Sequence, residues 1–157
     1  MTTMKRTLAF VSALLAVGAL TAVPSNAATP TASVIGSGTP TVTWSGTTAL
    51  PVGGAYCISS DDPVCDNFFL EVTTTGYVTV TISPKVTGDD WDLFVFDDDG
   101  QTVGTSQHMG GGSETSCFPV EARGRWEVDA APFLVSLRAG YRGVATWSST
   151  PVAPCAA

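Results

Sequence analysis

Short segments in which apolar and polar residues alternate recur along most of this chain, and this two-residue period limits its fold more than any other feature. NFFLEVT at 67–73 and YVTVTIS at 77–83 are two clear examples. Successive side chains of a β-strand point to opposite faces of a sheet, so such alternation predicts strands with one buried face. No window holds a convincing 3.6-residue apolar period. We therefore expect an all-β fold.

The alternating segments are separated by clusters of Gly, Pro, Ser and Asp, which are typical of turns. Threonine-rich faces indicate that one side of each sheet is solvated. Eight or nine such strands with no helix between them predict an antiparallel β-sandwich or barrel. The expected strands are 41–44, 67–73, 77–83, 90–96, 102–106, 114–120, 125–130, 133–138 and 141–148.

The first 27 residues have the features of a secretory signal peptide. Lys5 and Arg6 precede an apolar run of about 13 residues, and Ser25 and Ala27 fit the small positions of a cleavage site. The run is shorter than the roughly 20 residues that a membrane helix needs. We expect cleavage near residue 28, which would leave a secreted, extracellular protein.

About 130 residues remain after cleavage, enough for one compact domain. Residues 28–40 are rich in Thr, Ser, Pro and Gly, which predicts a flexible lead-in. The expected organisation is a signal peptide at 1–27, the lead-in at 28–40 and a single β-sandwich domain at 41–157.

The charge balance excludes some classes of partner. The chain has seven basic and fourteen acidic residues, and loss of the signal peptide removes two basic ones, so the mature charge is 5 − 14 = −9. Such a surface repels phosphate backbones and anionic lipid surfaces. We expect neither nucleic-acid binding nor adsorption to membranes.

All four cysteines lie in the exported part of the chain. An even number of cysteines in an oxidising compartment predicts two disulfides, although four cysteines allow three pairings. Proximity favours Cys57–Cys65, which leaves Cys117–Cys155 to hold the C-terminal tail. A zinc site is the competing interpretation, but the sequence has no CxxC pair and His108 is its only histidine.

The acidic segment DDWDLFVFDDDG at 89–100 contains a candidate ligand surface. Alternation puts Leu93 and Val95 on one face of the strand and Phe94 and Phe96 on the other. We expect the aliphatic face to be the core side. The two phenylalanines should then face solvent.

An outward aromatic strip flanked by acids would be a binding surface, because exposed aromatic patches often mark interaction sites. Phe94 and Phe96, with Phe69 on a neighbouring strand, are the candidate ligand-binding residues. Two alternatives remain open: a loop or the N-terminal segment covers this face, or the register is opposite and the face packs inward.

The aspartates allow two interpretations. Asp89, Asp90 and Asp92 are candidate calcium ligands, since hard cations bind several oxygens at about 2.3–2.6 Å. Asp90 and Asp92 stand about 7 Å apart on one strand face, which is wide for one ion unless a loop bends them together. The run from Asp97 to Gly100 does not fit an EF-hand loop and is typical of a hairpin turn.

Catalysis is not expected. His108 lies in the glycine-rich segment QHMGGGS, which cannot hold an imidazole rigidly, and the sequence has no GxSxG or HExxH motif. We therefore interpret His108 as a solvated loop residue and expect no enzyme.

Five segments in order, VCDNFFLEV, YVTVTI, DDWDLFVFDDDG, GRWEVDAAPFLV and YRGVATW, resemble the bacterial pre-peptidase C-terminal domain. The match covers roughly residues 41–148, and its most specific element is DWDLFVFD at 90–97. The resemblance implies an antiparallel, jelly-roll-like β-sandwich that is usually appended to a secreted peptidase and has no catalysis of its own. Relatives in that family include collagen-binding modules of bacterial collagenases, some of which bind calcium.

We therefore expect a secreted, non-catalytic extracellular binding or peptidase-accessory module. Its ligand would be an extracellular protein or polysaccharide, a secreted peptidase is a further candidate partner, and calcium is the one candidate cofactor. One alternative is a secreted protease inhibitor or peptidase-associated chaperone, for which the glycine-rich segment 106–116 is a poor bait loop. A second alternative is a structural component of the cell surface.

Overall fold

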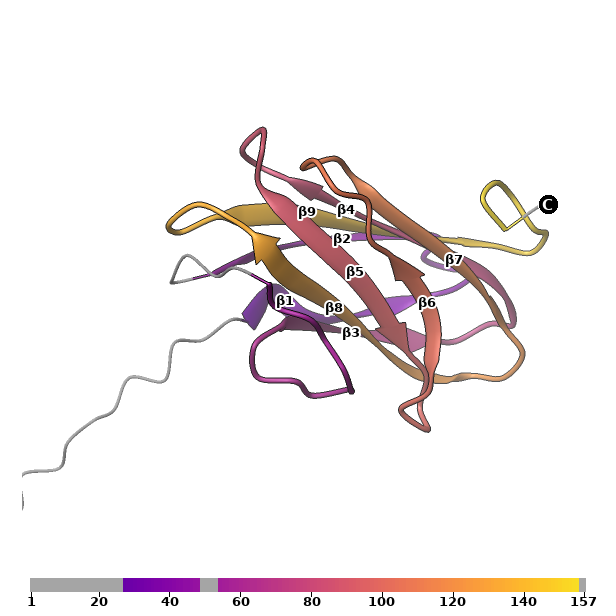
Figure 1. The fold of residues 1–157 in the computed structure, drawn as a ribbon. Helices are drawn as coiled ribbons and strands as arrows, with labels where there is room; N and C mark the ends of the chain where they lie inside the picture. The colour runs from indigo at the N-terminus through magenta and orange to yellow at the C-terminus, as the bar shows by residue number, and fades with distance from the viewer. Residues whose placement is uncertain (1–26, 49–53, 156–157) are drawn as a thin grey trace, which may run out of the picture.

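The computed structural model describes residues 27–48 and 54–155, and within these ranges the protein is built from strands alone (Figure 1). None of these residues forms a helix long and apolar enough to cross a membrane. The all-β prediction is therefore confirmed. The nine strands are β1 (Ala27–Ile35), β2 (Thr41–Thr47), β3 (Asp66–Val72), β4 (Gly76–Pro84), β5 (Asp90–Phe96), β6 (Thr102–Ser106), β7 (Glu114–Val120), β8 (Gly124–Leu134) and β9 (Gly140–Ser148).

The strands form one sheet that folds over into two layers, as in a β-sandwich. Their order is β6-β5-β8-β3-β1-β2-β9-β4-β7. Every described pair is antiparallel except β1 with β3. Strand β1 connects the two halves, because it pairs with β3 on one side and meets β2 on the other at Thr29 and Ser45. The halves face each other, and β5 contacts β4 and β7 across the interior (Figure 1).

The main core lies between the two layers. The apolar alternation expected at 67–73 and 77–83 is confirmed, since the aliphatic residues of both segments are buried in this core. Leu93 and Val95 of β5 also belong to it, as predicted. Gly143 in β9 leaves space for the indole of Trp44, which stacks on Phe68 with ring centroids 4.0 Å apart.

The expectation of a flexible lead-in at 28–40 is wrong. Residues 27–35 form strand β1, and the side chains of Ala28 and Ile35 are buried. The pairing with β3 is interrupted between Ala27 and Ala32, where Pro30 has no N–H to donate. The Thr, Ser, Pro and Gly content of this segment is typical of a linker. The segment forms a strand because its backbone pairs with β3, and residues of any type can make these hydrogen bonds. The predicted signal peptide, apart from Ala27, lies outside the described residues.

The prediction of two separate strands at 125–130 and 133–138 is also wrong. The structure has one strand, β8, which ends at Leu134. The chain then turns, with the N–H of Ala139 bonded to the carbonyl of Ser136. Pro132 can lie inside this strand because the register against β5 shifts between Asp90 and Trp91.

Both expected disulfides are present. Cys57–Cys65 closes a loop just before β3, and Cys117–Cys155 joins β7 to the C-terminal tail. The described part of the chain has no free cysteine. The pairing favoured by proximity along the chain is therefore confirmed.

Candidate functional site

The prediction that Phe94 and Phe96 face solvent is wrong. They lie on the face of β5 opposite Leu93, as alternation requires, but their exposed fractions are only 2% and 1%. The loop closed by Cys57–Cys65 covers them, and both cysteines pack with the two rings in a second apolar cluster. The two phenylalanines are therefore core residues and present no surface to a ligand.

The covering loop explains why the sequence pattern gave a wrong prediction for Phe94 and Phe96. Alternation determines which face of β5 carries a side chain, but exposure depends on what else packs against that face. Here the loop between β2 and β3 folds back over β5, and Tyr56 contacts the edge of the Phe94 ring with centroids 4.7 Å apart. The first of the two alternatives considered above, a covering loop, is the one that the structure adopts.

Phe69, the third residue of the expected strip, is half-buried and its ring face is occupied. The guanidinium carbon of Arg125 lies 3.7 Å from the Phe69 ring centroid, a cation–π contact. Arg125 also approaches Glu71, with 3.9 Å between Nε and Oε1. Arg125 and Phe69 form one wall of a surface pocket of about 180 Å³. The pocket is lined by Ser60, Asp61, Phe69, Asp97, Asp98, Arg125 and Glu127.

A buried polar network lies behind this pocket. The Glu127 Oε1 atom accepts hydrogen bonds from the N–H of Asp61 and from Asn67 Nδ2, both at 2.6 Å. Asn67 Nδ2 also donates to Asp129 Oδ1 at 3.1 Å. Burial, followed by the nearby Glu127 charge, raises the pKa of Asp129 to about 9. At neutral pH Asp129 is therefore protonated.

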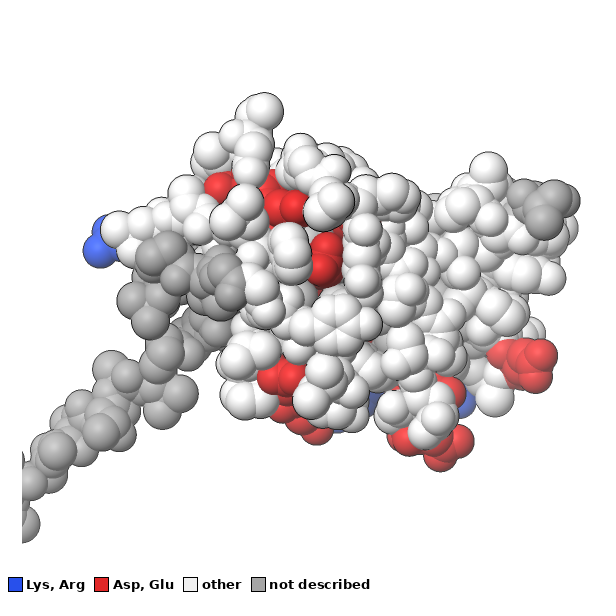
Figure 2. Space-filling view, viewed as in Figure 1, with Lys and Arg blue, Asp and Glu red and all other residues white. Residues whose placement is uncertain are grey.

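The acidic residues at the other end of β5 form a second candidate site. Asp90 and Asp92 from β5 and Glu114 from the start of β7 have exposed fractions of 5%, 6% and 0%, and we refer to these three as the acidic recess. Figure 2 shows acidic side chains sunk between loops at this end of the molecule. The two strands are neighbours across the sandwich, which explains how residues more than twenty positions apart meet.

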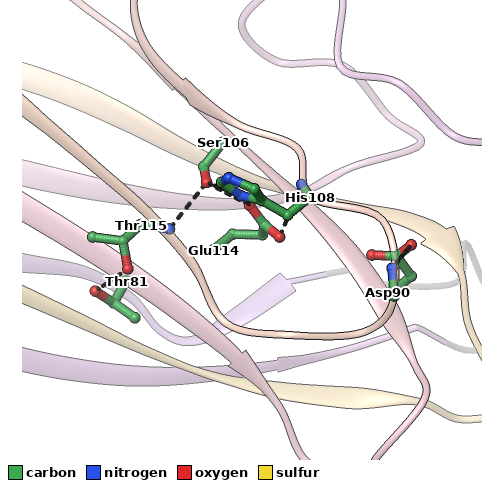
Figure 3. Close-up of polar contacts among 7 residues, drawn as sticks. Thr81, Asp90, Ser106, His108, Glu114 and Thr115 are labelled. Carbon is green, nitrogen blue, oxygen red and sulfur yellow. Dashed lines mark hydrogen bonds and ion pairs between the residues drawn. The ribbon is translucent and has the colours of Figure 1, made fainter.

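Glu114 is held by the loop between β6 and β7 (Figure 3). Its carboxylate accepts hydrogen bonds from Ser106 Oγ and from the N–H of His108, the latter at 3.1 Å. The Nδ1 atom of His108 lies 3.0 Å from Glu114 Oε2. Hydrogen bonding to Glu114 and the Glu114 charge raise the pKa of His108. The imidazole is otherwise solvated, with 82% of its side chain exposed, as the sequence indicated.

The three aspartates expected as calcium ligands have different surroundings. Asp89 is engaged elsewhere, because its carboxylate accepts hydrogen bonds from the N–H and the hydroxyl of Ser136 at 2.8 and 3.2 Å. Asp90 accepts one from the N–H of Gly110 at 3.3 Å, and its Oδ1 atom is buried without a partner. Asp92 accepts no hydrogen bond from any described residue. Burial, then the charges of Asp90 and Glu114, raise the pKa of Asp92 to about 6.

Asp90 and Asp92 therefore come together with Glu114, while Asp89 does not join them. Glu114 was missed because an acid that opens a strand has no distinguishing pattern in sequence. Within residues 27–48 and 54–155, the one group of three potential metal-ligand atoms within 4.8 Å of one another is Cys57, Cys65 and Asp129. Its two sulfur atoms are bonded to each other, so it is not a metal site.

The turn after β5 has the structure expected from its sequence. Asp97 Oδ1 accepts hydrogen bonds from the N–H groups of Asp99 and Gln101, at 3.0 and 2.8 Å. Gly100 adopts a φ of 73°, which glycine tolerates best. The aspartates of this run cap a hairpin, as predicted.

Three loops meet around the acidic recess and expose apolar side chains. The β4–β5 and β8–β9 loops are joined by Asp89 and Ser136, and the β6–β7 loop reaches β5 through Gly110 (Figure 1). Four exposed residues on these loops and at the end of β8 form what we call the apolar rim. They are Val86, Met109, Leu134 and Leu137.

Comparisons with known proteins give a limited result. No family model matches the chain, and no curated protein matches it. Solved structures with a similar fold include the pre-peptidase C-terminal domain of a Bacillus anthracis collagenase, with 11% identity, a TM-score of 0.48, and coverage of 73% of this chain and 94% of that one. A periplasmic inhibitor of g-type lysozyme from Aeromonas hydrophila has 12% identity, a TM-score of 0.43, and coverage of 75% and 96%.

A third similar structure is a β-glucosidase from Paenibacillus barengoltzii, with 12% identity and a TM-score of 0.38. The match covers 72% of this chain but only 11% of the glucosidase. All three TM-scores are below 0.5, so they support no functional statement. Membership of the pre-peptidase C-terminal family, which the sequence motifs resemble, stays a prediction.

Proposed function

We propose that this protein is a secreted, non-catalytic binding module whose apolar rim contacts an extracellular protein. The observation that carries the proposal is the apolar rim itself. Singly exposed apolar residues are ordinary, whereas a group on adjoining loops is typical of a protein–protein contact. The Asp89–Ser136 hydrogen bonds tie the β4–β5 loop to the β8–β9 loop, and the Gly110–Asp90 hydrogen bond holds the β6–β7 loop against β5, so the surface is held together before a partner arrives.

The geometry around His108 supports a role without catalysis. Ser106, His108 and Glu114 lie together, and these are the residue types of a serine hydrolase triad. In a triad the serine and the acid bond to different ring nitrogens of the histidine. Here both approach Nδ1, at 3.3 Å for Ser106 Oγ and 3.0 Å for Glu114 Oε2, and the serine hydroxyl donates to Glu114 directly. The imidazole is therefore not placed to take the serine proton.

Protein is favoured over polysaccharide as the ligand class. Polysaccharide recognition would have used the expected aromatic strip, but Phe94 and Phe96 are buried and Phe69 is covered by Arg125. The apolar rim consists of aliphatic residues and methionine, which suit the apolar core of a protein interface.

The experiment compares retention on insoluble collagen, chitin and cellulose. We expect the protein to be retained by collagen, as an extracellular protein polymer, and not by the two polysaccharides. The double substitution Leu134→Ser and Leu137→Ser should abolish retention. Val34→Ser and Ile58→Ser, which change exposed residues away from the rim, are the matched control and should have no effect.

Two outcomes contradict the proposal. One is retention by chitin or cellulose but not by collagen, and the other is undiminished retention of the rim variant. The alternative of a secreted inhibitor is tested in parallel with a panel of secreted proteases at stoichiometric concentration. If the protein inhibits a protease, and the rim variant inhibits it equally well, the result would favour that alternative.

A further inference from the structure

Asp66, the first residue of β3, is a buried carboxyl group without a counter-charge. Only 2% of its surface is exposed, and burial raises its pKa to about 7. Its Oδ2 atom accepts a hydrogen bond from the N–H of Thr47 at 3.2 Å, whereas its Oδ1 atom is buried and has no partner with normal hydrogen-bond geometry. No Lys or Arg of the described residues forms an ion pair with Asp66. A buried carboxyl group of this kind is costly unless a cation meets it.

The start of strand β1 lies beside this carboxyl group (Figure 1). Strand β1 runs parallel to β3, and Ala27 lies opposite Asn67, the residue that follows Asp66. Ala28 comes next and is 1% exposed. Burial raises the pKa of Asp66, while the N–H of Thr47 and then the N–H of Ala28 lower it. The backbone nitrogen of Ala28 therefore faces Asp66 inside the protein.

This nitrogen is the atom that signal-peptide cleavage would change. Ser25 and Ala27 fit the small positions of a cleavage site, so Ala28 would be the first residue of the exported chain. Hydrolysis of the Ala27–Ala28 peptide bond adds one water, with the hydroxyl bonded to the carbonyl carbon of Ala27 and the hydrogen to the nitrogen of Ala28. The new amine takes up a proton at neutral pH, because an α-amino group has a pKa of about 8. The N–H beside Asp66 thereby becomes an ammonium group.

We propose that cleavage after Ala27 creates an α-ammonium group on Ala28 that forms a buried ion pair with Asp66. The pair supplies the counter-charge that the uncleaved chain lacks at this position. The protein then reaches its full stability only after the signal peptide has been removed. The inference rests on the predicted cleavage position and not on the apolar rim, so it and the proposed function can fail separately.

The position of the pair explains why it would matter for the whole fold. Strand β1 connects the two halves of the sheet, through β3 on one side and through Thr29 and Ser45 on the other. Asp66 already bonds to β2 through Thr47, and a side chain at Gly46 would overlap its Oδ2 atom. An ion pair from Ala28 to Asp66 would therefore hold β1, β2 and β3 together at the junction of the two halves.

The experiment begins with the intact mass of the exported protein, which should correspond to a chain that starts at Ala28. Thermal unfolding at pH 7 then compares this chain with one that keeps Ala27, released from a fusion by a site-specific protease. The extra residue turns the Ala28 ammonium back into an amide and moves the terminal charge away. We expect the longer chain to have a Tm lower by about 5 °C or more.

Variants show whether the difference between the two chains depends on the carboxyl group. Asp66→Asn keeps the shape of the side chain but removes its charge, so the Tm difference between the two chains should disappear. Asp98→Asn changes an exposed aspartate far along the chain and is the matched control. The Tm difference should persist in this control variant.

The pH dependence is a second readout, which remains available if Asp66→Asn does not fold. In the pair the pKa of the ammonium should rise above about 8, and its stabilisation is lost as pH rises through that value. The pKa of Asp66 should fall, and its stabilisation is lost as pH falls through the lowered value. Tyr141 and Asp129, the other titratable groups at this place, are uncharged at pH 7. The Tm advantage of the chain that starts at Ala28 should therefore be largest near pH 7 and smaller at both extremes.

Acylation of amines measures the terminal group directly. The chain from residue 28 onward has one lysine, the exposed Lys85, which serves as the internal reference. Mass spectrometry of the two labelled positions across pH gives the pKa of the Ala28 amine, which should lie above about 8. An exported chain that starts at another residue, equal Tm values for the two chains at pH 7, or an Ala28 amine with a pKa of about 8 or lower would overturn the proposal.

Discussion

Replacing Phe94 with alanine should strongly reduce the free energy of unfolding of this protein, because the ring is buried beneath the loop closed by Cys57–Cys65. A buried aromatic side chain removes about 150–250 Å² from water. At about 25 cal/mol per Å² this corresponds to about 4–6 kcal/mol. The alanine methyl recovers a part, so we expect the free energy of unfolding to fall by about 3–5 kcal/mol.

The assay is urea unfolding, followed by fluorescence at constant pH, together with thermal unfolding. For the 157 − 27 = 130 residues that follow the predicted signal peptide, the loss corresponds to a Tm decrease of about 11–18 °C. Phe94→Leu provides a milder version, at about 1.5 kcal/mol or less, that remains measurable if Phe94→Ala does not fold. Phe133→Ala is the matched control, because its ring is partly exposed, and should cost about 1 kcal/mol at most.

The result also decides between two views of β5. If the loop closed by Cys57–Cys65 did not cover the sheet, Phe94 would be a surface residue and Phe94→Ala would cost no more than Phe133→Ala. The burial argument would be refuted if both variants lost the same free energy of unfolding and the slope of that free energy against urea concentration did not change.

Three further outcomes can be checked by the same unfolding measurements. Removing the second disulfide with Cys117→Ser and Cys155→Ser should cost about 4 kcal/mol, from the 38-residue separation that it closes; a loss below about 1 kcal/mol would mean that the tail does not constrain the unfolded chain. Gly143→Ala should destabilise by about 1–3 kcal/mol and shift the tryptophan fluorescence, because the added methyl overlaps the Trp44 indole; an unchanged spectrum would contradict this packing. The raised pKa of Asp129, about 9, means that the folded state binds a proton that the unfolded state releases near pH 4, so stability should fall as pH rises across this interval, by at most about 1.4 kcal/mol per pH unit. Asp129→Asn should reduce that slope between pH 5 and pH 8, and an identical slope would show that the group is not responsible.

The strand pattern was predictable because it is a local property of the chain. Segments 67–73 and 77–83 have the burial that their alternation implies, and so do Leu93 and Val95. The turn at Asp97 was predictable for the same reason, since its hydrogen bonds join residues within four positions of one another. The pairing of Cys57 with Cys65 also follows from short separation along the chain.

Features that depend on distant segments were missed or misjudged. Strand β1 is held by backbone bonds to β3, which leave no mark in its side chains, and its composition suggested a linker. Glu114 joins Asp90 and Asp92 only because β7 and β5 face each other across the sandwich. The spacing of these three acidic residues along the sequence does not predict that they lie close together.

By itself, the sequence determined most of the strands, the apolar face of segments such as 67–73 and 77–83, and a strong excess of acidic residues. Only the tertiary structure decided which polar or aromatic faces are covered and which acids come together. The physical reason is that side-chain direction follows from the local backbone, whereas loss of contact with water requires a second segment, here the loop over Phe94 and Phe96, whose position the local pattern does not contain.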